Sequence, residues 1–481
     1  MKKYIPGTAR NMRRSRFTCL LALAIMSLSS CKKFVTVEDP PTLLTQDKVF
    51  NSDASATAAM VSIYTSMMND IYGSNGSFVC FAMSELGGMS ADELAYTQSS
   101  TVTPYFLQFS NHALTPDNTY VGALWSDGYT YIYRANAILE GLASSTGMSD
   151  SVKTQLTGEA HFMRAFCYFY LVNIFGDVPL ELTTDYTVNM HMPRTAAASV
   201  WGQVVADLQT AKTNMSDAYP TSGRLRPNKW TASALLARAF LYQGKWQDAE
   251  NESTALLNSG VYSTTLPPLT QVFKMTSTEA IWQLQPVAAN ANTPEGTHFL
   301  TVANTQPAFE LTPQVLNAFE TGDPRLTNWV GFSSTANPSW AYPAKYKAGA
   351  GALSEYYVVF RLAEQYLIRA EARIQQGNIA GGVADLNVIR ARARSGDTTV
   401  LPDVLASLSQ SDALSAVMHE RQVELFAEWG HRWFDLARTN QATAVLQPLS
   451  PPNTWKPGSI LYPVPATEIL ANPALTQNAA Y

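Results

Sequence analysis

The sequence predicts a mainly α-helical protein, and three observations support this fold class. Apolar residues recur at helical spacing over several long segments, a helix-pair pattern occurs twice in the same register, and one proline-rich stretch interrupts the helical pattern. The chain has 481 residues, of which 46% are apolar and 15% charged, so it is long enough to bury a large core. We therefore expect a helical scaffold that carries a more irregular region.

The N-terminal residues have the layout of a bacterial lipoprotein signal. Six basic residues precede or adjoin an apolar run from Phe17 to Leu28, and the Leu-Ser-Ser-Cys tetrapeptide that ends at Cys31 is a lipobox. The run has 12 residues, whereas a membrane span needs about 20. We predict that residues 1–30 are removed and that Cys31 is lipidated. If translation starts at Met12 instead of Met1, the signal is shorter but keeps its basic stretch, its apolar run and its lipobox.

Four helices are predicted after residue 50 from the spacing of their apolar residues. They span Ser52–Met68, Tyr120–Leu142, Ser149–Phe175 and Val200–Met215. Gly176 and Pro179 follow the third segment, and both residue types are typical just beyond a helix C-terminus. Because the fourth segment repeats the apolar spacing, we expect it to pack against the third as a helical hairpin.

A helix-pair pattern occurs in Ala232–Gly260 and again in Leu362–Ala393, with an offset of 133 residues. In each copy an alanine, Ala237 or Ala370, precedes a glycine by seven positions. A small residue suits a close crossing of two helices and a glycine suits the turn between them, which is how tetratricopeptide repeats are built. For either copy taken alone, an ordinary antiparallel helix pair is the alternative.

Two stretches differ from this helical pattern. Residues 264–354 contain nine prolines and scattered aromatic residues, so they cannot form a continuous helical array. Residues 73–116 are also loop-like. Long insertions into a rigid scaffold are common places for a binding face, so we expect one at about 73–116 and 264–354. Residues 31–49 are expected to be a tether, and residues 50–481 a single domain.

Charge and motifs exclude several functions. Removal of residues 1–30 takes away six basic and no acidic residues, which changes the net charge from −5 to −11 and argues against nucleic-acid binding. The sequence has no GxSxG, HExxH, GxxxxGK[ST] or GxGxxG motif, and its six histidines lack metal-ligand spacing. We therefore expect no catalytic residues, metal or cofactor. Cys80 and Cys167 either pair or remain separate, with Cys167 as a small buried residue.

An acidic cluster near the C-terminus alternates with arginines on one predicted helix and its exit. Its members are Glu420, Arg421, Glu424, Glu428, Arg432, Asp435 and Arg438. Glu428 and Arg432 are four residues apart in the favourable order for a pair within a helix. We interpret the cluster as a structural network. Glycoside hydrolysis needs two carboxylates that face each other across a cleft, and spacing along the chain cannot reveal such a pair.

Aromatic residues on the insertions are candidates for sugar binding. A sugar ring has an apolar face of C–H groups and a rim of hydroxyls, so it binds to flat aromatic rings beside amide and acidic acceptors. The candidate ligand-binding residues are Tyr96, Asp92, Trp329, Trp340, Tyr342 and Asn337. The alternative is that these rings pack the loops onto the helical body.

Several ordered stretches of the chain resemble the SusD/RagB family of outer-membrane lipoproteins from Bacteroidetes. They are Tyr133–Leu139, Gly158–Phe166, Phe175–Pro179, Phe360–Ala372, Glu420–Arg438, Tyr462–Pro465 and Gln477–Tyr481. The resemblance implies a SusD-like, mainly α fold in which four tetratricopeptide-like helix pairs support a loop-rich region.

The resemblance also implies a function. Such proteins are not enzymes; they capture oligosaccharide at the cell surface, cap a TonB-dependent transporter of the SusC type, and serve polysaccharide utilisation. We therefore expect a glycan-binding lipoprotein, anchored in the outer membrane and facing the cell exterior. A peptide-capturing transporter lid of the RagB type is one alternative, and a glycoside hydrolase is another.

Overall fold

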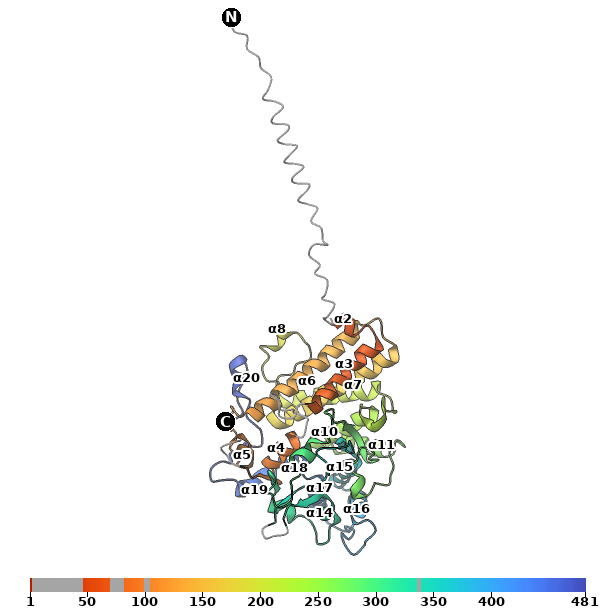
Figure 1. The fold of residues 1–481 in the computed structure, drawn as a ribbon, viewed down its shortest axis with the longest axis vertical. Helices are drawn as coiled ribbons and strands as arrows, with labels where there is room; N and C mark the ends of the chain where they lie inside the picture. The colour runs from red at the N-terminus through yellow and green to blue at the C-terminus, as the bar shows by residue number, and fades with distance from the viewer. Residues whose placement is uncertain (2–45, 70–81, 99–103, 335–338) are drawn as a thin grey trace. The chain divides into compact units, whose positions relative to one another are not determined.

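The computed structural model describes Met1 and residues 46–69, 82–98, 104–334 and 339–481. The predicted signal, Cys31, most of the tether, and Cys80 lie outside these residues. Val49–Tyr481 forms one compact unit, drawn from orange to blue in Figure 1. Among the helices that the structure describes, we find none with both the length and the apolar character that a bilayer crossing requires.

Long helices that pack side by side form most of this unit (Figure 1). They are α3 (Asp53–Asn69), α6 (Thr119–Ser144), α7 (Asp150–Phe175), α9 (Ala197–Asn214), α10 (Lys229–Tyr242), α11 (Trp246–Leu257), α15 (Leu362–Gln375), α16 (Ile379–Arg394) and α17 (Gln410–Leu425). In the order α6, α7, α9, α10, α11, α15 and α16, each helix contacts the next. The mainly α fold is therefore confirmed.

Short elements connect and flank these helices. The short helices are α2 (Gln46–Val49), α4 (Ala82–Ser90), α5 (Pro104–Ser110), α8 (Tyr186–Asn189), α12 (Pro294–His298), α13 (Pro313–Leu316), α14 (Pro324–Trp329), α18 (His431–Arg438), α19 (Ala442–Leu446) and α20 (Ala466–Ala471). The strands are β1 (Leu94–Tyr96), β2 (Ala280–Leu284), β3 (Phe309–Leu311), β4 (Val330–Phe332), β5 (Ala341–Pro343) and β6 (Tyr357–Arg361). They form three antiparallel pairs, β1 with β3, β2 with β6 and β4 with β5.

The four helices predicted from apolar spacing are confirmed as α3, α6, α7 and α9, with ends shifted by at most three residues. The Asn118 side chain caps α6 by accepting the backbone N–H groups of Tyr120 and Val121. α7 ends where Gly176 adopts a φ of 72°, a conformation that glycine reaches without strain. α7 and α9 pack together, as the expected hairpin requires.

Both copies of the helix-pair pattern fold as pairs, α10 with α11 and α15 with α16. The turn glycines Gly244 and Gly377 have positive φ angles of 67° and 83°. In the second pair, a Cβ on Gly382 would lie 2.6 Å from the Ala370 carbonyl oxygen, so the helix crossing depends on this glycine. The number of tetratricopeptide-like pairs stays a prediction.

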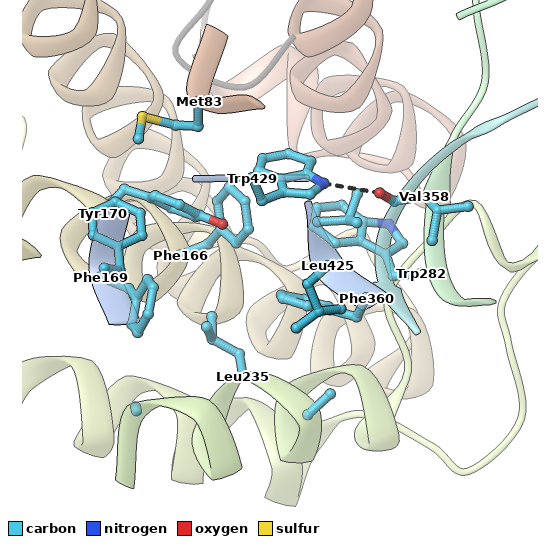
Figure 2. Close-up of a cluster of buried hydrophobic side chains, with 14 of the residues drawn as sticks. Met83, Phe166, Phe169, Tyr170, Leu235, Trp282, Val358, Phe360, Leu425 and Trp429 are labelled. Atoms are coloured by element: carbon cyan, nitrogen blue, oxygen red, sulfur yellow. Dashed lines mark hydrogen bonds between the residues drawn. The ribbon is translucent and has the colours of Figure 1, made fainter. Parts of the chain in front are cut away.

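An aromatic core joins α7 to the β2–β6 pair and to a C-terminal turn (Figure 2). Phe166 of α7 meets the ring of Trp282 from β2 edge to face, with centroids 5.6 Å apart. It meets Trp429 in the same way at 5.8 Å. The Trp429 indole N–H donates to the Val358 carbonyl of β6 at 2.9 Å, the dashed line in Figure 2. These contacts hold the irregular region on the helical scaffold.

The loop-like interpretation of residues 73–116 needs a correction, because α4 forms within this stretch. Its two glycines lower helix propensity, but they permit close packing. A Cβ on Gly87 would lie 2.7 Å from the Cα of Gly430, so the two backbones touch. The Trp429 backbone N–H also donates to Ser84 Oγ at 3.0 Å. Tertiary contacts from the C-terminal part of the chain therefore select the helical state of α4.

The predicted helix through the acidic cluster is interrupted, which corrects a second expectation. α17 ends at Leu425 and α18 begins at His431. Ala427, Trp429 and Gly430 between them have positive φ angles. The turn places the Trp429 ring in a stack on Tyr357, with centroids 4.9 Å apart.

Because of this break, the predicted Glu428–Arg432 pair does not form. Glu428 instead binds Lys345 and Arg361 at 2.5 and 2.8 Å. Arg432 binds Asp92 at 2.7 Å.

The acidic cluster does form a buried structural network, as expected. Glu424 is fully buried and contacts three guanidinium groups, those of Arg325, Arg361 and Arg392. Burial opposes ionisation of Glu424, but these arginines outweigh it and lower its pKa to about 2. The network joins α14, β6, α16 and α17 and leaves no carboxylate of this group open to solvent.

Candidate functional site

Short strands bring the two predicted insertions together. β1 from the first insertion pairs with β3 from the second, so Tyr96 lies opposite Phe309. β3 also contacts β5, and β5 pairs with β4. Tyr96, Phe332, Trp340 and Tyr342 therefore lie on neighbouring short strands or beside them, and we call these four residues the loop face.

Tyr96 of the loop face is half-buried. Its ring packs against Phe106 of α5 at 4.9 Å and against Phe309 at 5.3 Å. Phe106 in turn stacks on Tyr120 at 4.3 Å. Tyr96 and Tyr120 are the partly exposed members of this aromatic group, and Phe106 and Phe309 support the Tyr96 ring.

Tyr342 lies over a glycine of the partner strand. Its register partner across the β4–β5 pair is Gly331. A Cβ on Gly331 would lie 2.3 Å from Cζ of the Tyr342 ring and 2.7 Å from its hydroxyl oxygen. The absence of a side chain at position 331 therefore lets the Tyr342 ring lie close over the backbone of β4.

Phe332 and Trp340 complete the loop face. Phe332, at the end of β4, is 52% exposed. Trp340 is half-buried, and its carbonyl accepts the backbone N–H of Ser333 at 3.0 Å, which extends the β4–β5 pairing. Aromatic composition did not distinguish Phe332 as a site residue; its exposure does, although its register partner is the buried Ala341 and it lies on the opposite side of the β4–β5 pair from Tyr342. Asn337 lies outside the described residues.

Polar groups flank the aromatic rings on the solvent side of β3. Glu310 is the register partner of the exposed Ala95, so its side chain lies on the outer face of the β1–β3 pair. Its carboxylate accepts a hydrogen bond from the Gln306 amide at 3.3 Å. Tyr96 pairs with Phe309 and therefore lies on the opposite face of the β1–β3 pair from Glu310, so this carboxylate and amide are close to the loop face but do not share a side with Tyr96.

Two predicted site residues belong to the interior, and the structure corrects them. Trp329 is 1% exposed, and its indole N–H donates to the Leu269 carbonyl at 3.2 Å. Lys345 and Arg392 lie over its ring at 4.9 and 5.4 Å from the centroid, so buried cations occupy the face that a sugar would need. Asp92 is 5% exposed, and both of its carboxylate oxygens bind Arg432.

Metal and thiol chemistry find no support in the described part of the chain. Within those residues, no group of three or more His, Cys, Asp or Glu side chains has a geometry that could hold a metal ion. Cys167 is a buried free thiol, and burial raises its pKa, so it is not a nucleophile at neutral pH. His161 lies within 2.7 Å of Asp207, in keeping with a structural role.

We expect Gly331→Ala to displace the Tyr342 ring with little effect on stability. The added methyl group overlaps the free end of the ring, which can rotate away, and surface changes of this kind usually cost about 0.5 kcal/mol or less. A crystal structure of the variant, with chemical denaturation, measures both effects. Gly202→Ala is the control, because a Cβ there meets no atom within 4 Å. An unmoved Tyr342 ring would contradict the predicted contact.

Two family models match this chain, one in its N-terminal part and one in its C-terminal part. Residues 46–241 match a family model described as "Starch-binding associating with outer membrane". Residues 328–481 match the model of the SusD family. The second match includes β4, β5 and therefore most of the loop face.

Relatives and solved structures agree with these matches. The chain is 25% identical to SusD-like protein P25 of Formosa agariphila, over 95% of this chain and 97% of that protein. A SusD superfamily protein from Bacteroides vulgatus has a similar fold, with a TM-score of 0.78 at 20% identity, over 89% of this chain and 99% of that one. A laminarin-binding SusD-like protein gives a TM-score of 0.73 at 24% identity, over 90% of this chain and 100% of that one.

Proposed function

Because this chain belongs to the SusD family, we propose that it binds oligosaccharide at the cell surface and passes it to a TonB-dependent transporter of the SusC type. The description of the first family model as starch-binding, and the laminarin binding of one structural neighbour, support a glycan as the ligand. The protein acts by binding and not by catalysis. The lipobox at Cys31 supports a lipid anchor in the outer membrane.

The observation that carries this proposal is the loop face. Tyr96 comes from one insertion, while Phe332, Trp340 and Tyr342 come from the other, and strand pairing brings them together. Flat rings supply C–H contacts to a sugar, and the Tyr342 hydroxyl can hydrogen-bond to its hydroxyl groups. Binding is expected to be weak, because a sugar exchanges hydrogen bonds with water for hydrogen bonds with protein at little net gain.

Isothermal titration of the purified protein against a panel of oligosaccharides tests the proposal. We expect at least one glycan to bind, and Trp340→Ala and Tyr96→Ala to weaken that binding about tenfold each, because each removes a ring from the loop face. Trp246→Ala is the matched control, since Trp246 is a half-buried tryptophan at the start of α11 and lies outside the loop face.

Three outcomes would contradict the proposal. They are the absence of binding to any glycan, unchanged binding by both loop-face variants, and tight binding of peptides by a protein that ignores glycans. The last result would favour a peptide-capturing lid. Release of reducing sugar during the titration would instead indicate a glycoside hydrolase.

A further inference from the structure

A groove of about 450 Å³ lies between α6, α8 and α20, and the loop face does not contribute to it. This volume falls within the range of small-molecule sites, roughly 300–1,000 Å³. Four aromatic residues line the groove: Trp125, Tyr129, Tyr133 and Tyr186. Tyr133 is 52% exposed and Tyr186 is 73% exposed, which is unusual for rings of this size.

Two carboxylates line the same groove, Glu181 before α8 and Glu468 in α20. In the described part of the chain, neither has a lysine or arginine within ion-pair distance. Burial and then the nearby Glu468 raise the pKa of Glu181 to about 7. Burial also raises the pKa of Glu468, against the effect of a hydrogen bond from the Trp125 indole. Both carboxylates are therefore partly desolvated and lack a counter-charge.

The other charged and titratable groups near Glu181 do not supply that counter-charge. Tyr129 of α6 and Tyr168 of α7 face it, and burial raises the pKa of both, so both stay neutral near neutral pH. The positive charge of Arg194 lowers the pKa of Tyr129. The Arg194 guanidinium does not pair with Glu181, because it donates to the backbone carbonyls of Phe175, Asp177 and Thr476 and to the Asn478 side chain. The positive charge of Arg164 lowers the pKa of Tyr168, but Arg164 forms its ion pair with Asp207.

We propose that this groove binds an amino sugar through its protonated amine. An ammonium group between Glu181 and Glu468 would relieve their mutual repulsion, and aromatic faces attract a cation while they cover the apolar side of a sugar ring. A neutral sugar gains the ring contact but leaves the two carboxylates without a counter-charge. Recognition of a charged amine in this groove is independent of glycan binding at the loop face.

Isothermal titration with the glucosamine disaccharide at about pH 7.5 tests the proposal, with its N-acetylated form, which lacks the charge, as the matched ligand. We expect only the disaccharide that is not acetylated, and therefore carries ammonium groups, to bind in the groove. Glu181→Gln should weaken this binding about tenfold or more, because the variant keeps the shape but loses the charge. Glu252→Gln is the control, since Glu252 pairs with Lys212 and does not line the groove. Trp340→Ala should leave this binding unchanged, which separates the groove from the loop face.

Acidification provides a second readout. Because the pKa of Glu181 is raised to about 7, it takes up a proton as the pH falls, and the affinity for the amine should decrease towards about pH 5.5. Stronger binding in acid would overturn the proposal, as would equal binding of the N-acetylated disaccharide. Equal binding of lysine amide would overturn the assignment to a sugar, because the ring would then contribute nothing.

Discussion

Replacement of Glu424 with glutamine is expected to lower the free energy of unfolding by about 3–5 kcal/mol, the usual cost of removing one partner from a buried ion network. The carboxylate is fully buried among Arg325, Arg361 and Arg392, and its removal takes from these three guanidinium groups the one carboxylate that they share. Urea denaturation at neutral pH measures the change.

A comparison with a more exposed ion pair distinguishes the effect of burial on stability from the effect of pairing itself. Glu250→Gln removes a carboxylate that binds Arg373 at 2.9 Å, where both side chains are 21% exposed. We expect a loss of about 1 kcal/mol or less for this variant, because solvent screens the pair. Equal losses for the two variants would mean that the buried network does not hold the C-terminal helices together.

The same network predicts the behaviour of the protein in acid. The pKa of Glu424 is about 2, below its ordinary value of 4.5. The folded state therefore favours the ionised form, and this contribution to stability is present above the unfolded pKa and is lost as the pH falls towards 2. Glu424→Gln should accordingly show a smaller loss of stability on acidification than the wild-type protein.

Glu295→Gln is expected to stabilise the protein in alkaline solution and to have little effect in acid. Burial raises the pKa of Glu295 to about 8, because the hydrogen bonds from Tyr357 and Ser84 compensate it only in part. A raised carboxyl pKa means that the folded state binds more protons than the unfolded state between the two pKa values. The contribution of Glu295 to wild-type stability therefore decreases as the pH rises from 4.5 to about 8.

The glutamine variant lacks this ionisation, so its advantage should grow across the same interval. A shift of one pKa unit corresponds to about 1.4 kcal/mol of stability. The shift of Glu295 from 4.5 to about 8 therefore limits the stability gained by the variant in alkaline solution to about 4–5 kcal/mol. Denaturation at about pH 5 and about pH 9 measures the difference. Glu252→Gln, at a partly exposed ion pair, should change stability by about the same small amount at both pH values. A constant difference for Glu295→Gln would contradict the raised pKa.

The long helices were predictable because each buries a continuous apolar stripe, and that stripe is a local property of the sequence. α7 shows this most clearly, since Gly176 marks its end in the sequence and in the structure. α4 was not predictable, because its glycines argue against a helix until Gly430 packs on Gly87. The break after Leu425 has the same kind of cause, since the position of Trp429 depends on Tyr357 and Val358 of a distant strand.

The candidate site was predictable as a region and only partly as residues. Sequence composition indicated which insertions carry aromatic rings, and strand pairing brings those insertions together. Composition does not distinguish a ring that faces solvent from one that buried cations cover, as Trp340 and Trp329 show. The groove beside α8 depends on α20 from the C-terminal end, and no spacing along the chain indicates that contact.

The attachment of α4 has a consequence for the order in which the chain acquires its shape. α4 contacts the neighbouring α5 and β1, but two of its hydrogen bonds reach late residues: the one from Trp429 to Ser84 spans 345 positions, and the one between Tyr462 and Ser90 spans 372. Closing such long loops costs little extra free energy but is slow. A ribosome-bound or truncated chain that ends before residue 426 therefore lacks the packing of Gly430 on Gly87 and the hydrogen bond from Trp429 to Ser84. Such an incomplete chain would remain a substrate for proteases and chaperones until the residues after 426 are synthesised and pack on α4.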